Sequence, residues 1–254
     1  MSDFPYRSAL VTGAARRIGA AIAADLAANG WAVAIHYNTS AEDAAQLAET
    51  IGAGGGTAVT LQADLSREDA IAGFVGRAED ALGPLTCLVN NASVFENDIP
   101  ETVTRESWDL HMQVNLRAPF VLTQAFARQL PDGIEGNVVN ILDQRVWNLT
   151  PYFTTYTLSK AGLWTLTRTL AMALAPRVRV NAIGPGPTLP SARQSDEQFI
   201  RQWASLPLGR AVMPDEIVDA LRFILDAPSV TGQMIAVDGG QHMGWKRDEP
   251  TLDE

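Results

Sequence analysis

Short β-branched runs alternate with longer alanine-rich segments of helical periodicity along the 254 residues of this chain. The expected strands lie in SALVT, WAVAIHY, TAVTLQAD, TCLVNNAS, NVVNIL, RVRVNAIG and QMIAVD. The expected helices cover about residues 18–29, 41–50, 67–81, 104–130 and 153–175, and a further helix begins at Pro214. Such alternation requires parallel strands joined by right-handed helical crossovers. The sequence therefore predicts an α/β fold, a doubly wound parallel β-sheet flanked by helices.

The length suits a single domain covering residues 1–254. The Pro/Gly-rich stretch GPGPTLP and its continuation, about residues 185–212, form a long irregular segment. Loops of this length in compact domains are often functional, so we expect a substrate loop or lid there. An ordinary surface insertion is the alternative.

Composition and charge exclude several classes of function. No apolar run reaches transmembrane length and the N-terminus lacks a basic, signal-like pattern, so we expect a cytoplasmic protein without a membrane partner. A net charge of −10 disfavours nucleic acid as a partner. Cys87 is the single cysteine, and His36, His111 and His242 stand at no metal-ligand spacing, so no metal is expected.

The first strand-to-helix turn, TGAARRIGA, is a candidate phosphate site. Gly13 and Gly19 allow close backbone approach, and the free N–H groups at a helix start attract phosphate. Arg16 and Arg17 oppose the helix dipole there, which favours a bound anion over two solvated arginines.

The end of the second expected strand, AIHYNTS, has no acidic residue to bind the ribose hydroxyls of NAD. Asn38, Thr39 and Ser40 are neutral hydrogen-bonding groups, and an arginine of the preceding turn is in reach. We therefore expect NADPH rather than NADH, although Glu42 and Asp43 add negative charge nearby.

Tyr156 and Lys160 stand four residues apart, on one face of an expected helix. An ammonium near a phenol favours the phenolate, so we expect the pKa of Tyr156 to lie below its usual value, closer to the acid-base range. Asp143 lies thirteen positions before the tyrosine.

These motifs jointly resemble the short-chain dehydrogenase/reductase family over essentially the whole chain. The resemblance is carried by TGAARRIG, LVNNAS, Asn115, YTLSK and the Pro-Gly turn after RVRVNAIG. It implies a seven-stranded Rossmann-like sheet, catalytic Tyr156 and Lys160, Asn115 holding a water of the proton relay, and a homotetramer formed partly through the helices near 104–130 and 153–175. The expected cofactor-binding residues are Gly13, Arg16, Arg17, Ile18, Gly19, His36, Tyr37, Asn38, Ser40, Asp64, Asn91, Ala92, Ser93, Lys160, Pro185 and Gly186.

Departures from the common family pattern look like the pteridine reductase subgroup, including its dihydromonapterin reductase relatives. Arg17 replaces a glycine, Asp143 replaces a serine, and NNAS ends in Ser93 where NNAG is usual. By this resemblance Arg17 and Ser93 contact cofactor phosphate and pterin, and Phe95 stacks on the pterin ring. Asp143 joins Tyr156 as a catalytic and substrate-binding residue that accepts hydrogen bonds from the pterin or donates a proton to it.

A carboxyl group at position 143 suits a pterin for a physical reason. It can pair with the N–H-rich edge of an aminopterin or protonate a ring nitrogen, whereas beside a developing oxyanion it opposes the charge. The alternatives are an Asp143 that caps a turn and a Phe95 that packs under a loop. Trp147, Phe153 and Trp203 are further candidates for a flat aromatic pocket, each with a structural alternative.

The sequence thus predicts an NADPH-dependent reductase that transfers hydride to a C=N bond of a pterin, with dihydropterins and dihydrofolate as substrates. A ketone or 3-oxoacyl thioester reductase of the same family is one alternative. A non-catalytic NADP-binding sensor or scaffold is the other, and the set of Asn115, Tyr156 and Lys160 argues against it.

Overall fold

The computed structural model describes residues 6–191 and 194–244. Seven parallel strands form one sheet in the order β3-β2-β1-β4-β5-β6-β7. The strands are β1 (Ser8–Val11), β2 (Ala32–Tyr37), β3 (Thr57–Gln62), β4 (Cys87–Asn90), β5 (Gly136–Ile141), β6 (Val178–Pro185) and β7 (Met234–Val237). This topology confirms the predicted doubly wound sheet.

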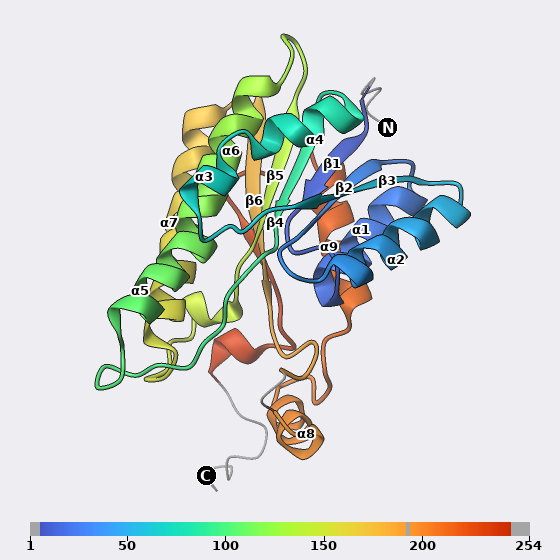
Figure 1. Cartoon of the computed structure of the whole chain (residues 1–254). Helices are drawn as coiled ribbons and strands as arrows, with labels where there is room; N and C mark the ends of the chain where they lie inside the picture. The colour runs from blue at the N-terminus through green and yellow to red at the C-terminus, as the bar shows by residue number, and fades with distance from the viewer. Residues whose placement is uncertain (1–5, 192–193, 245–254) are drawn as a thin grey trace, which may run out of the picture.

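Helices cover both faces of the sheet (Figure 1). One face carries α1 (Arg17–Ala28), α2 (Ala41–Ala53) and α9 (Pro214–Asp226), and the other carries α3 (Glu68–Ile71), α4 (Phe74–Leu82), α6 (Ala118–Gln129) and α7 (Thr154–Leu174). Strands β1, β4 and β5 are buried along their whole length, which is why they appear in the sequence as continuous apolar runs. None of the described helices is long and apolar enough to cross a membrane.

Three expected segments differ in detail from the structure. The helix expected at 67–81 is divided into α3 and α4, because Gly73 adopts a φ of +73° between them. The segment expected at 104–130 contains α5 (Arg105–Met112), a π-helical turn η1 (Gln113–Arg117) and α6. The predicted lid includes a helix, α8 (Asp196–Ala204), which lies apart from both helical layers, beyond the carboxyl ends of the strands (Figure 1). Residues 192–193 of that lid lie outside the described residues.

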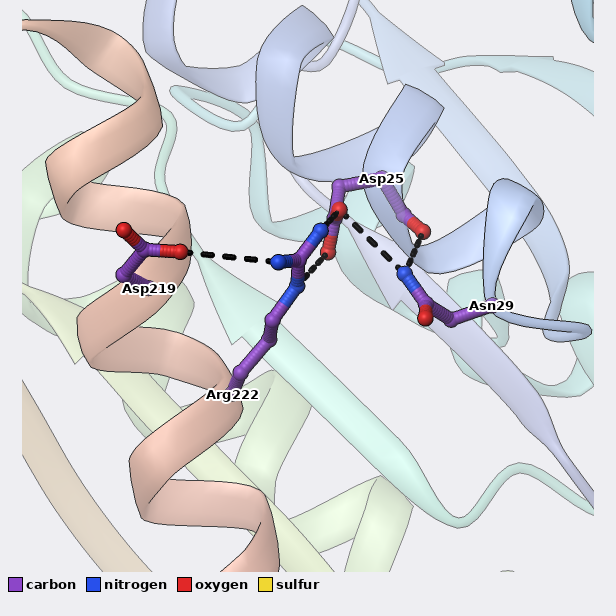
Figure 2. A network of polar contacts seen from close by, with 4 residues as sticks. All are labelled: Asp25, Asn29, Asp219 and Arg222. Carbon is purple, nitrogen blue, oxygen red and sulfur yellow. Dashed lines mark hydrogen bonds and ion pairs between the residues drawn. The ribbon is translucent and has the colours of Figure 1, made fainter.

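An ion pair joins two helices that are remote in sequence. Arg222 of α9 donates through Nε to Asp25 Oδ2 of α1 at 3.0 Å and through a second nitrogen to Oδ1, and Asp25 also accepts from Asn29 (Figure 2). The fork-to-carboxylate arrangement fixes the relative position of α1 and α9.

Candidate active site

Two adjoining cavities open at the carboxyl ends of the strands, where the strand order reverses between β1 and β4. The first has a volume of about 600 Å³ and the second about 750 Å³. Both are lined by Arg17, Ile18, Asn91 and Ser93. The first is also lined by the predicted cofactor residues Gly13, Arg16, Gly19, His36, Tyr37, Asn38, Ser40, Asp64 and Ala92. The second is also lined by Phe95, Asp143, Tyr156, Lys160, Pro185 and Gly186.

The glycine turn is built for close approach. Gly13 has a φ of +60°, and a Cβ there would lie 2.9 Å from the Ala92 Cα. A Cβ on Gly19 would lie 2.3 Å from the Gly13 carbonyl oxygen. Both positions exclude any larger residue, so the start of α1 keeps its backbone exposed to the first cavity.

His36 supports that turn from the end of β2. Its Nδ1 accepts a hydrogen bond from the Gly13 N–H at 2.9 Å, and its Nε2 lies 3.1 Å from the Ala63 carbonyl oxygen. Burial lowers the pKa of His36 to about 4, against the raising effect of the bond to Ala63. A neutral ring with its proton on Nε2 satisfies both contacts. His36 therefore shapes the turn.

The adenosine end of the first cavity is lined by Tyr37, Asn38, Thr39 and Ser40, and no acidic residue occurs at 36–40. Arg16 lines the same cavity and pairs with Asp43, with Nε 3.5 Å from Oδ2 and both side chains about half exposed. A 2′-phosphate bound there would have neutral hydrogen-bond donors and the Arg16 guanidinium as partners. It would compete with Asp43 for that guanidinium. The residues present fit NADPH.

Asp64 and Arg17 make contacts within the chain. One oxygen of Asp64 accepts from the N–H and hydroxyl of Ser66 at 2.9 and 2.7 Å, which closes a local turn beside the cavity. Arg17, with a φ of +59°, donates to the carbonyl oxygens of Leu189 and Pro190 at 3.0 and 2.9 Å. The predicted contacts of Arg17 with phosphate and pterin stay predictions.

The two oxygens of Asp143 have different partners. Oδ1 accepts from the backbone N–H of Arg145 at 2.8 Å and so caps the short 3-10 helix η2 (Gln144–Val146). Oδ2 accepts from the Tyr156 hydroxyl at 2.9 Å. The turn-capping alternative and the predicted site geometry are therefore both present, one on each oxygen.

The expected direction of the Tyr156 pKa is wrong for this structure. Burial raises the pKa of Tyr156 well above its usual value, and the charge and hydrogen bond of Asp143 add to the effect, while Arg145 opposes it. Lys160 donates to the Ile141 carbonyl oxygen at 2.8 Å and is 2% exposed. Burial lowers the pKa of Lys160 to about 8, although Asp143 acts in the other direction. The phenol is thus a hydrogen-bond donor to Asp143.

Asn115 lies in the π-helical turn, fully buried and behind the cavity wall. Its Oδ1 accepts from the Val94 N–H at 2.8 Å, and its Nδ2 donates to the Val94 carbonyl at 2.9 Å and to the Ser159 hydroxyl at 3.1 Å. The Ser93 hydroxyl also donates to Asn115 Oδ1, at 3.2 Å. Asn115 thus ties the loop after β4 to the helix that carries Tyr156.

Aromatic rings form one wall of the second cavity. Phe95, which is 38% exposed, stacks on Phe153 with ring centroids 4.3 Å apart and planes 7° from parallel. It also meets Tyr156 edge-on at 4.7 Å. Trp147 packs against Trp164 and His242 instead and does not line either cavity. Phe95 and Phe153 thus form an aromatic part of the lining of the second cavity.

Several cavity residues were missed by the sequence reasoning. Trp203 does not line either cavity. The second cavity is lined instead by two residues that follow Asp143, by three residues of α8 and by three residues of other segments. These are Gln144 and Arg145, then Gln198, Phe199 and Gln202, and finally Leu189, Gln194 and Gln241. The sequence did indicate Gln144 and Arg145, because they directly follow Asp143 in a loop already assigned to the site. The α8 residues lie within the segment at about 185–212 that was expected to be a substrate loop or lid, but no local pattern indicates which of its side chains line the cavity. Among the described residues, no cluster of three potential metal ligands occurs.

Comparisons with known proteins agree with this geometry. The family model for enoyl-(acyl carrier protein) reductase matches residues 13–242. The chain belongs to the short-chain dehydrogenase/reductase family. Among members of this family, an uncharacterized oxidoreductase of Methylorubrum extorquens is 36% identical, over 94% of this chain and 99% of the relative. A 3-oxoacyl-[acyl-carrier-protein] reductase of Synechocystis sp. is 32% identical, over 96% of this chain and 100% of the relative.

The solved structure of FolM alternative dihydrofolate reductase 1 from Brucella canis, complexed with NADP, is 50% identical to this chain. The superposition covers 96% of each chain with a TM-score of 0.92. The fold is therefore that of a short-chain dehydrogenase/reductase.

Proposed function

We propose that this protein reduces a C=N bond of a dihydropterin, with dihydrofolate among its substrates. The protein is an NADP-dependent oxidoreductase of the short-chain dehydrogenase/reductase family. The observation that carries the choice of substrate is the 2.9 Å hydrogen bond from the Tyr156 hydroxyl to Asp143 Oδ2 inside the second cavity. The name of the Brucella canis structure, an alternative dihydrofolate reductase, supports the same class.

NADPH, when bound, supplies the hydride for the ring carbon. The proton for the ring nitrogen would come from side chains of this protein. Tyr156 carries a proton that already points at Asp143, and the buried Lys160 ammonium lies 5.8 Å from the phenol ring. A pair of groups that shares one proton next to a nitrogen heterocycle can donate that proton and hold the adjacent N–H group. Phe95 would carry the flat ring, and this positioning would supply much of the rate.

A ketone or 3-oxoacyl thioester reductase is the second candidate, favoured by the Synechocystis relative. Its chemistry needs donors around a developing oxyanion. Asp143 instead places an acceptor beside the phenol and accepts the hydrogen bond of its hydroxyl. The Asp143 carboxyl group therefore disfavours the transition state of carbonyl reduction.

Parallel NADPH-oxidation assays with a dihydropterin, dihydrofolate and model ketones test the proposal. Replacing Asp143 with Ser restores the common family residue, and we expect kcat/KM for pterins to fall by about 100-fold or more, the usual contribution of a general acid. Ketone reduction should fall by less than about 10-fold or rise, because an opposing acceptor is removed.

Asp143→Asn is the matched variant, since it keeps an acceptor of similar shape that cannot ionise. Phe95→Ala should raise KM for pterins by roughly 10-fold through lost stacking and leave ketones less affected. Equal losses on pterins and ketones in Asp143→Ser, or no loss at all, would reject the role given to Asp143. Reduction of ketones alone by the wild type would select the carbonyl reductase.

Association into a homotetramer also stays a proposal. It is supported by apolar side chains of α5 and α7 that are exposed and line neither cavity: Trp108, Leu158 and Met172 are each at least 41% exposed. These are the two segments from which the family resemblance implies the subunit contacts.

A further inference from the structure

Arg145 stands out among the cations of the second cavity. Among the residues that the structure describes, the other two cations lining this cavity are engaged, since Arg17 donates to two carbonyl oxygens and Lys160 donates to Ile141. Arg145 has no carboxylate within 4.0 Å in residues 6–191 and 194–244. A guanidinium with no carboxylate partner in a cavity can take an anion from a ligand.

The side chain of Arg145 is held in place by two neighbours. Its guanidinium carbon lies 5.0 Å from the centroid of the Phe153 ring, and one of its nitrogens donates to the Thr150 hydroxyl. Its Nε is buried with no hydrogen-bond partner among the described residues. Stacking on an aromatic ring orients the planar guanidinium and limits the entropy lost on binding. The cation is thus preorganised and incompletely satisfied.

Phe153 connects this cation to the proposed ring site. Its backbone has a φ of +59°, a strained conformation for a residue other than glycine, and its ring stacks on Phe95 at 4.3 Å. The same ring contacts the guanidinium of Arg145. A ligand ring on Phe95 would therefore have a cation within reach of a substituent, beside but separate from the Tyr156 hydroxyl.

The overall charge makes a local cation necessary for an anionic substrate. With a net charge of −10 the protein repels anions at long range, so recognition depends on a guanidinium in the cavity. A planar guanidinium pairs with a carboxylate through two parallel hydrogen bonds.

We infer that Arg145 binds the carboxylate of a substrate tail and makes the enzyme select tailed pterins such as dihydrofolate over pterins without an anionic tail. This inference rests on the proposed pterin reductase function and names its substrate class. Asp143 and Tyr156 act at the ring, whereas Arg145 acts at the other end of the ligand.

Steady-state kinetics on three substrates test it: dihydrofolate, dihydropteroate, whose shorter tail ends in a benzoate carboxylate in place of the glutamate, and a dihydropterin with a short uncharged substituent. Arg145→Gln should raise KM for dihydrofolate by about 10-fold, as expected for one charge-assisted pair. KM for the short dihydropterin should change by less than about twofold. Arg145→Lys should recover part of the loss, because it keeps the charge but not the fork.

Arg168→Gln is the matched control. Arg168 also lies over an aromatic ring, 5.8 Å from the Trp164 centroid, but it does not line either cavity. It should leave all three KM values unchanged.

An equal KM increase on all three substrates in Arg145→Gln, or no increase on dihydrofolate, would overturn the inference while the pterin reductase proposal stood. A wild type that reduces none of the three would overturn both. Recovery of part of the dihydrofolate KM in Arg145→Lys separates loss of the guanidinium fork from a folding defect.

Discussion

Tyr156 and Lys160 lie one turn apart on α7, yet groups outside that helix set their protonation. Burial, reinforced by Asp143, raises the pKa of Tyr156 and keeps its proton on the phenol, and burial lowers the pKa of Lys160 to about 8. The spacing of the pair was readable in the sequence. The electrostatic balance was not, because it depends on burial and on a carboxylate thirteen residues away.

The pKa of Lys160 predicts an alkaline limit on reduction. The ammonium is present below about pH 8 and is lost above it, so kcat/KM for the proposed reduction should fall as pH rises through about 8. Lys160→Arg keeps its charge throughout, so any residual activity should extend to higher pH. A wild-type profile that stays flat to about pH 10 would contradict the assignment to Lys160.

At the scale of elements, the catalytic helix receives its N-terminal cap from another segment. The residue before α7, Phe153, offers no side-chain cap. Asp98, in the loop after β4, accepts from the Thr155 N–H at 3.0 Å and from the Thr155 hydroxyl, and its backbone carbonyl accepts from Thr154 at 3.1 Å. Its Oδ2 also accepts from Ser107 at 2.7 Å. This buried carboxylate therefore holds together the loop with Phe95 and the helix with Tyr156.

Asp98→Asn should lower the free energy of unfolding by about 1 to 3 kcal/mol at pH 7. Burial of Asp98 opposes its ionisation, but the bonds from Thr155 and Ser107 dominate and hold its pKa below the usual value. A lowered folded-state pKa means that the stabilisation is complete above the unfolded-state value, about 3.9, and is lost as pH falls through the folded-state pKa.

Denaturant unfolding at pH 7 and near pH 3 would measure this effect, and the difference between wild type and Asp98→Asn should shrink at the lower pH. Asp109→Asn is the control, because Asp109 makes only an exposed pair with Arg105 and should cost a few tenths of a kcal/mol. A constant difference at both pH values would show that the charge of Asp98 is not what caps α7.

At the scale of the whole molecule, the first cavity is lined by residues from both halves of the sheet. Residues after β1, β2 and β3 meet residues after β4 where the strand order reverses. A ligand bound there should couple the two halves and stabilise the fold as a unit.

NADPH at about 100 times its Kd should stabilise the protein by about 2.7 kcal/mol, which is roughly 5 to 10 °C in Tm for a chain of this size. NADH at the same concentration should give a smaller shift, because the neutral groups at 38–40 and Arg16 favour a 2′-phosphate. Thermal unfolding with each cofactor measures both shifts. A larger shift with NADH would contradict the predicted preference.

The amino-acid sequence by itself determined the parallel sheet, the phosphate turn at Gly13 and the Tyr156–Lys160 pair, because hydrophobic periodicity and glycine chemistry act over a few neighbouring residues. Only the tertiary structure decided the remote contacts: Asp143 against the Tyr156 hydroxyl, Asp98 at the start of α7, Arg145 beside Phe153, and α8 over the second cavity. Such contacts depend on how strand ends and loops meet in space. Burial then changes the pKa values of the groups brought together, which no local pattern encodes.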